Sequence, residues 1–296
     1  MGAFALSPAS RDAAILTGLP AGGYSAHLVA GSGPGIALVE VYDADPGTPS
    51  NQISNVSARS LAGTGAAVLT VGYSIAGDAR KTVLIRAIGP TLAGFGVSDA
   101  LTNPRLRLFS SRGNELCAND DWPATAGWAT AASSVGAFPL LAGSLDSVLL
   151  VSLPPGTYTA QASAMGDASG VALIEVYDVP SPPAGSYVLQ PVENLVPPIP
   201  RTGLGTPAVP PAVLTQARPS YPFELRRVGL TGEALVDFIV DPTGVVIGAY
   251  VIRAADTLFA EAALAAVRQW TFRPGRNAAG QNIAVRMLVP IVFALN

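Results

Sequence analysis

Apolar residues alternate with polar or small residues in several short stretches of the first two thirds of the chain. Clusters of Gly, Pro, Asn and Asp, which favour turns, separate these stretches. This arrangement is typical of a β-sandwich. The expected strands cover residues 53–57, 67–73, 81–86, 105–109, 146–153, 158–164 and 171–177, and a short helical turn is expected after Gly89-Pro90.

The pattern changes near residue 221. Alternation from Ala234 to Val240 predicts a strand, and residues 245–253 predict its hairpin partner after a turn. Apolar residues then recur at helical spacing from Phe259 to Trp270, and alternation returns from Ile283 to Phe293. With a short helix expected at residues 221–227, the order α-β-β-α-β predicts two helices on a three-stranded antiparallel sheet.

An internal repeat relates the start of the chain to its middle. Residues 2–43 and 136–178 share 21 identical residues over 42 aligned positions, with one inserted residue. Residues 44–179 are therefore expected to be one complete β-unit, and residues 1–43 the last third of a preceding one. Because Met1 aligns with Val135, we also hypothesise that the native chain begins further upstream.

A Pro-rich linker is predicted at residues 180–218, before a small domain at residues 219–296. From Pro180 to Pro222, 12 of 43 residues are Pro and three are charged. This composition favours a semi-extended spacer. The sequence thus predicts a multidomain protein, with an all-β sandwich followed by a small α+β domain.

Composition excludes several kinds of chemistry. The chain has one Cys and one His, which excludes an intrachain disulfide and a Cys/His zinc site and argues against a His-based catalytic triad. The net charge of −3 does not suggest nucleic-acid binding. Gly, Pro and Ser interrupt the two long uncharged stretches, and no secretory signal or transmembrane helix is expected. We expect no enzyme and no cofactor.

One acidic loop is a weak candidate for a metal site. Asn119, Asp120 and Asp121 carry oxygen atoms that could contribute to a hard-cation site such as one for Ca²⁺. The spacing does not complete a coordination shell, and an Asx-type turn is the favoured alternative. Cys117 lies in an apolar strand context, where a buried, inert thiol is expected.

The second half of the β-unit resembles the bacterial pre-peptidase C-terminal type of β-sandwich. The resemblance covers about 75 residues and implies an extracytoplasmic, non-catalytic module. The residues that carry it are Leu106-Arg107-Leu108-Phe109, Arg112-Gly113, Asn119-Asp120-Asp121, Asp146-Ser147-Val148, Leu153 to Tyr158 and Val176-Tyr177-Asp178.

The C-terminal region resembles the TonB C-terminal domain. The matching residues are Tyr221-Pro222, Arg226-Arg227, Gly229, Gly232, Val236 to Phe238, Val240 to Val245, Phe259, Ala262-Ala263, Ala266-Val267, Trp270, Phe272 to Gly275 and Val289 to Phe293. The resemblance implies a periplasmic or envelope location in a Gram-negative-type bacterium. It also implies docking to outer-membrane TonB-dependent receptors. The family's membrane-anchoring helix and its Glu-Pro and Lys-Pro spacer are not present here, so the resemblance does not carry over its energy-coupling role.

The last predicted strand is the candidate peptide-binding site. In TonB-like domains this strand docks the short TonB box of receptors, together with the segment before Tyr-Pro, which here is residues 216–220. An edge strand accepts another strand through its unpaired backbone groups, and Pro290 suits an edge. The candidate residues are Ile283, Ala284, Val285, Arg286, Met287, Leu288, Val289, Gln216 and Arg218.

Two functions remain open at the level of the sequence. The first is a non-enzymatic envelope protein that binds partner peptides by strand addition, in a setting such as TonB-dependent transmembrane transport. The second is a structural or adhesive surface protein made of β-repeats, with no energy-transducing role.

Overall fold

The computed structural model describes residues 5–7, 9–29, 35–44, 52–122, 126–184, 186–193 and 204–295. The chain divides into two units, Met1–Ser54 and Asn55–Asn296. Most of the regular structure in the described residues is antiparallel β-sheet, with few helices.

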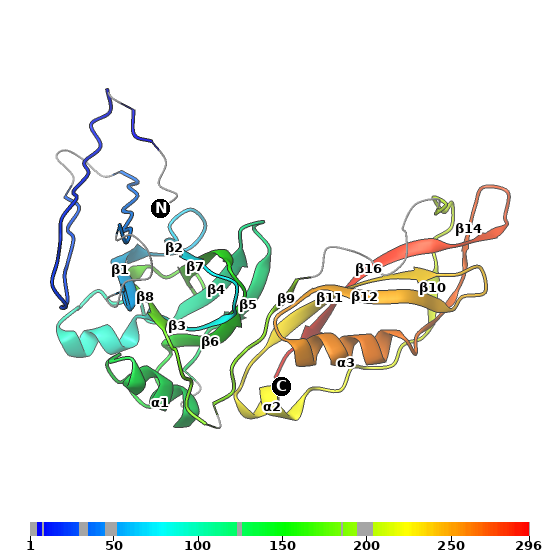
Figure 1. Ribbon diagram of the computed structural model, residues 1–296. Helices are drawn as coiled ribbons and strands as arrows, with labels where there is room; N and C mark the ends of the chain where they lie inside the picture. The colour runs from blue at the N-terminus through cyan, green and yellow to red at the C-terminus, as the bar shows by residue number, and fades with distance from the viewer. Residues whose placement is uncertain are drawn as a thin grey trace. The chain divides into compact units, whose positions relative to one another are not determined.

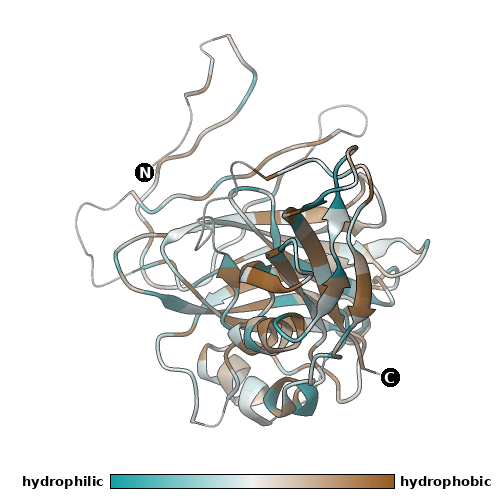
Figure 2. Ribbon diagram, turned by 90° about the vertical axis from the view of Figure 1, so that its right-hand side faces the viewer, coloured by the Kyte–Doolittle hydropathy of each residue, from teal (hydrophilic) through white to brown (hydrophobic). Residues whose placement is uncertain are grey.

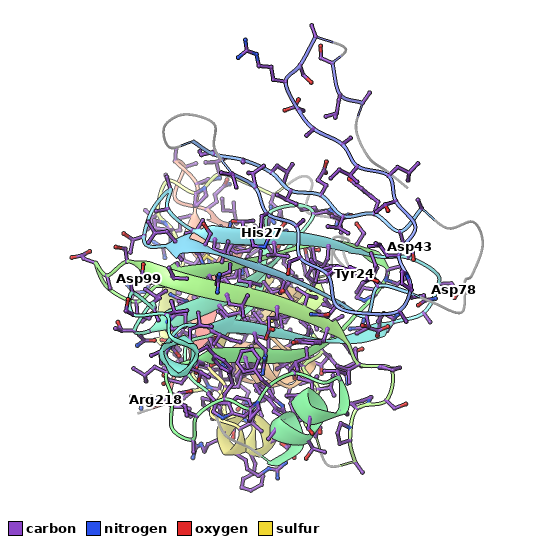
Figure 3. The ribbon with its side chains drawn as sticks, turned by 90° about the vertical axis from the view of Figure 1, so that its left-hand side faces the viewer. Tyr24, His27, Asp43, Asp78, Asp99 and Arg218 are labelled. Atoms are coloured by element: carbon purple, nitrogen blue, oxygen red, sulfur yellow. The ribbon has the colours of Figure 1, made fainter. Side chains whose placement is uncertain are left out.

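The described residues of the first unit form neither helix nor strand, and their side chains are exposed. Two of its tyrosines make local hydrogen bonds. The Tyr24 hydroxyl donates a hydrogen bond to the Pro20 carbonyl at 2.8 Å, and the Tyr42 hydroxyl donates to Glu40 at 2.9 Å. Figure 3 labels Tyr24, His27 and Asp43 along this segment. The strands expected in a preceding β-repeat are therefore not formed by the described part of this unit.

The second unit begins with two four-stranded antiparallel sheets (Figure 1). One sheet has the order β1-β8-β3-β6 and the other has the order β2-β7-β4-β5. Residues from both sheets join one buried apolar cluster. The strands are β1 (Asn55–Ala62), β2 (Leu69–Ile75), β3 (Lys81–Ile88), β4 (Pro104–Ser110), β5 (Glu115–Asn119), β6 (Ser147–Leu153), β7 (Gly156–Ala164) and β8 (Gly170–Asp178).

The predicted strands match seven of these eight, and β5 was not among them. The helical turn expected after Gly89-Pro90 is the 3-10 helix η1 (Pro90–Phe95). The sequence analysis also missed helix α1 (Ala126–Ser134). Trp128 of α1 is fully buried, and its indole Nε1 donates to the Tyr187 carbonyl at 2.8 Å.

The C-terminal region has the predicted order of elements. Helix α2 (Phe223–Arg227) precedes β11 (Gly232–Val240) and β12 (Val246–Ala254), and α3 (Thr257–Val267) then precedes β16 (Val285–Phe293). Helix α3 packs on β11 and β12 and buries Phe259, Ala263 and Val267. Figure 2 faces this region and shows brown, apolar stretches beside teal, polar ones along its strands.

The central sheet of this region has four strands, because a short strand from the linker joins it. Its order is β16-β11-β12-β9, with β9 at Val192–Glu193. Two small two-stranded sheets accompany it. They pair β10 (Ala212–Thr215) with β13 (Thr271–Arg273), and β14 (Gly275–Arg276) with β15 (Asn282–Ile283).

The described parts of the predicted linker do not behave as a free spacer. Leu189 exchanges backbone hydrogen bonds with Leu150 and Ser152, and Val192–Glu193 pairs with Arg253–Ala254 of β12. Further along, Val209 and Arg276 exchange backbone hydrogen bonds. The linker thus contributes paired backbone at both of its described ends, which the Pro content alone did not indicate.

The candidate peptide-binding edge

Strand β16 lies at an edge of the central sheet. Its ladder with β11 runs without a register shift from Val285, opposite Val240, to Phe293, opposite Gly232. The sheet order gives β16 one neighbour, β11, among the described strands. Its other side is not paired with any described strand, which is the position at which a further strand would add to the sheet.

The two faces of β16 differ in exposure. Val285, Ile291 and Phe293 are buried, while Met287 and Val289 are half-buried. On the opposite face, Leu288 is 51% exposed and Val292 is 67% exposed. This face therefore presents apolar side chains to any strand that joins the edge.

Pro290 indicates which way the backbone of β16 points. Proline has no N–H, so in an unbroken ladder its nitrogen is placed on the side away from the partner strand. Residues two apart in a strand point their backbone groups the same way. The outward donors are therefore those of Arg286, Leu288 and Val292, with a gap at Pro290.

Arg286 makes a strand-bridging ion pair. Its Nη2 and Nε atoms lie 2.6 Å and 2.9 Å from Oδ2 of Asp237, a fully buried residue of β11. The hydrogen bond to Asp237 and the charge of its carboxylate raise the pKa of Arg286. The sequence analysis named Arg286 as a candidate peptide contact, and the structure shows that its guanidinium pairs with a carboxylate of β11.

These geometric features coincide with a match to a known protein family. Residues 217–295 match the family described as Gram-negative bacterial TonB protein C-terminal. They form a TonB C-terminal domain. A comparison with curated proteins gave no match.

Hydrogen bonds within the TonB C-terminal domain hold the segment that precedes Tyr221. Trp270 Nε1 donates to the Ala217 carbonyl at 2.8 Å, and the Thr215 and Thr271 hydroxyls are 2.5 Å apart. Gln216 and Arg218 are exposed. These hydrogen bonds join the described segment to Trp270 and to β13.

The acidic loop of the β-unit has a structural role. Asn119 Oδ1 accepts from the Asp120 backbone N–H at 3.0 Å, and Asn119 Nδ2 donates to the Asp121 and Val148 carbonyls at 2.8 Å. This is the turn-capping arrangement that we favoured over a cation site. Among the described residues, no group of three or more Asp, Glu, His or Cys side chains is placed to hold a metal.

One buried carboxylate outside the edge was missed by sequence analysis. Asp256 is fully buried and accepts from Leu258 N, Gln190 N and the Tyr187 hydroxyl, each at 2.8 Å. Burial, followed by the hydrogen bond to Asp256, raises the pKa of Tyr187. An Asp directly before a helical apolar run signals an N-cap. That signal could have identified the cap, but not its contacts with the linker.

No helix in the described parts of the chain is both long and apolar enough to cross a membrane.

Proposed function

We propose that the TonB C-terminal domain binds an extended peptide of a partner protein by adding it as a strand to β16. The observation that carries this proposal is the place of β16 at the sheet edge, paired with β11 along its whole length. The family match to residues 217–295 supports it. The proposed partner is an outer-membrane TonB-dependent receptor or another envelope protein, and the proposed location is the periplasm or cell envelope.

The proposed role is non-enzymatic and consists of docking. Backbone hydrogen bonds from Arg286 and Leu288 supply affinity, and the exposed side chains of Leu288 and Val292 select apolar positions in the peptide. Affinity is expected to be modest, because an extended peptide buries few side chains and loses conformational entropy on docking. Ile283, Ala284, Gln216 and Arg218 remain proposed contacts beyond the strand itself.

The β-unit ahead of this domain is proposed to be a non-catalytic β-sandwich. Its two four-stranded sheets and the buried residues between them support this. Its resemblance to pre-peptidase C-terminal domains remains a prediction. In this proposal, the sandwich is an extracytoplasmic platform for the peptide-binding domain.

A second candidate function is that of a structural or adhesive β-repeat protein. The repeated Pro–Tyr contact favours it: the Tyr158 hydroxyl donates to the Pro154 carbonyl at 2.7 Å, as Tyr24 does to Pro20 at 2.8 Å. In that case the C-terminal domain would serve assembly and would not bind receptor peptides.

Titration of the full chain with peptides from the N-terminal segments of TonB-dependent receptors tests the proposal. The variant Leu288→Pro removes an outward donor and should weaken binding at least about tenfold, whereas Leu288→Ala keeps the donor and should weaken it only a few-fold. Circular dichroism must show that both variants keep the fold. Equal binding by the wild type and Leu288→Pro would contradict docking at β16. If neither peptides nor receptor plugs bind, the structural function is favoured.

A further inference from the structure

One side of the sheet β2-β7-β4-β5 packs into the sandwich core, and its other side faces outward. Leu106 and Leu108 of β4 are fully buried in that core. Because side chains alternate along a strand, the residues between and beside them point to the opposite side. These are Arg105, which is exposed, and Arg107 and Phe109, which are half-buried. We call the side of the sheet that carries these three residues the outward sheet face.

Arg107 lies on the outward sheet face with donors left for a ligand. Its Nη2 atom donates to Gln161 Oε1 of β7 at 3.1 Å, and its guanidinium carbon lies 5.2 Å from the centre of the Phe109 ring. A carboxylate oxygen of Glu115 on β5 is 3.8 Å from Nη1. A guanidinium has five N–H donors. Within the described residues Gln161 is its one hydrogen-bond acceptor, and 30% of the side chain is exposed, so further Nη donors can reach a ligand.

Arg105 gives the outward sheet face a second positive charge. It precedes Arg107 by two residues on the same side of β4, so the two residues are about 6.6–6.8 Å apart along the strand. Besides these two arginines, the four strands of the sheet carry one charged residue, Glu115. The face is therefore positive, although the whole chain has a net charge of −3. Charge complementarity favours a ligand with anionic groups repeated along its length.

Gly72 leaves a gap between the side chains of this face. It pairs with Thr159 of β7, which pairs on its other side with Phe109. The backbone of Gly72 is not left-handed, and a Cβ atom there would meet only the Tyr158 carbonyl oxygen, at 3.9 Å. Neither backbone conformation nor packing therefore requires a glycine, which weakens the interior of a strand. The missing side chain lets a ligand approach the backbone beside Phe109.

The neutral residues of the face can both donate and accept hydrogen bonds. They include the hydroxyls of Thr70 and Thr159 and the amide of Gln161, and Thr70 pairs with Gln161 in the row that contains Arg107. The hydroxyl groups of a sugar have the same dual character. The half-buried ring of Phe109 adds an apolar surface for the C–H groups of a sugar ring.

We propose that the outward sheet face binds a linear polysaccharide of uronic acid residues. Arg105 and Arg107 pair with carboxylates of the polymer, for which the planar guanidinium is well suited. Gln161 binds hydroxyl groups, and one sugar ring lies over Gly72 and against Phe109. This binding site goes beyond the peptide-binding function proposed for β16 and does not depend on it.

Other anionic polymers fit the face less well. The phosphates of a nucleic acid accept hydrogen bonds but do not donate them, so they would leave the acceptors of the face without partners. The backbone of an acidic peptide pairs with the edge of a sheet, whereas this face presents side chains. A polysaccharide carries both carboxylates and hydroxyls, which matches the arginines and the neutral residues together.

Calorimetric titration of the full chain with oligogalacturonate tests the proposal. Arg107→Gln should weaken binding at least about tenfold, and the exposed Arg105→Gln should weaken it a few-fold. Gly72→Val fills the gap beside Phe109 and should also weaken binding at least about tenfold. Because valine favours a strand and its Cβ atom has room, the urea midpoint of Gly72→Val should stay the same or rise. This combination separates a lost ligand contact from a lost fold.

Matched controls separate this site from a general charge effect. Arg59→Gln removes an exposed positive charge from β1, in the other sheet, and should leave the affinity for oligogalacturonate unchanged. The neutral polymer dextran should bind far more weakly than oligogalacturonate. No binding of oligogalacturonate, or equal binding by the wild type and by Arg107→Gln or Gly72→Val, would overturn the proposal. Polyglutamate that binds as tightly as oligogalacturonate would identify an acidic polypeptide as the occupant and overturn the assignment to a polysaccharide.

Discussion

Asp241 shows how a single carboxylate fixes the turn between β11 and β12. Its Oδ1 atom accepts from the Thr243 hydroxyl at 2.6 Å and from the backbone N–H groups of Thr243 and Val245 at 2.8 Å and 2.9 Å. The Thr243 hydroxyl is the main reason that the pKa of Asp241 is lowered. The pKa of Asp241 is therefore lower in the folded state than in the unfolded state. Its hydrogen bonds stabilise the fold fully at pH values above the unfolded-state pKa, and this stabilisation is lost as the pH falls through the folded-state pKa.

The substitution Asp241→Ala should therefore lower the free energy of unfolding at neutral pH by only about 0.5 kcal/mol, since water screens this exposed group. The difference from the wild type should shrink below about pH 4 as the carboxyl group protonates. Urea denaturation at several pH values measures both effects, with Asp78→Ala as the control. A difference that persists unchanged at low pH would contradict this account.

Cys117 should be chemically inert in the folded protein. The residue is buried in β5, and burial raises the pKa of its thiol far above its usual range. Because the thiolate is the reactive species, a thiol reagent at pH 8 should modify Cys117 only after denaturant is added. Rapid modification without denaturant would show that β5 is not packed as described.

At the scale of elements, Asp256 joins helix α3 to the linker. The variant Asp256→Ala removes the N-cap of α3 and leaves the backbone N–H of Gln190 without its acceptor. We expect a loss of about 2–4 kcal/mol in the free energy of unfolding. Tyr187→Phe removes one of the three hydrogen bonds and should cost about 1 kcal/mol. Denaturation of both variants checks this, and equal losses would mean that the cap contributes little.

The elements that could be predicted are those with a strong local pattern. Phe259, Ala263 and Val267 identified the buried face of α3, and the alternation up to Phe293 identified β16. Helix α1 was missed because Gly127, Thr130 and two serines weaken its helical signal, and it depends on burial of Trp128. Strand β9 has two residues and exists through its pairing with β12, which no local pattern encodes.

The candidate site could be predicted only in part. For the edge position of β16 the sequence offered one signal, Pro290, whose missing N–H suits an edge strand. The pairing of Arg286 with Asp237 did not, because it joins residues that are 49 positions apart. Likewise, the contacts of Asp256 with Tyr187 and Gln190 depend on how the linker folds back.

At the scale of the whole molecule, the linker contacts change the expected pattern of proteolysis. A free Pro-rich spacer up to residue 218 would be cleaved to release a stable fragment of roughly 80 residues that begins near Tyr221. In the structure, β10 pairs with β13, and Val209 pairs with Arg276. Limited proteolysis followed by mass spectrometry should therefore yield a C-terminal fragment that retains residues 208–215. A stable fragment beginning at Tyr221 would show that this pairing contributes little.

The peptide-binding role of β16 is the central claim of this account. Its most direct test is residue-resolved amide hydrogen exchange, measured by NMR on the full chain with and without a receptor peptide. The account predicts slower exchange for the outward amides of Arg286, Leu288 and Val292, and little change for those of Val285 and Met287, which face β11. Slower exchange confined to β12 or to the helices, with none at Arg286, Leu288 and Val292, would contradict it.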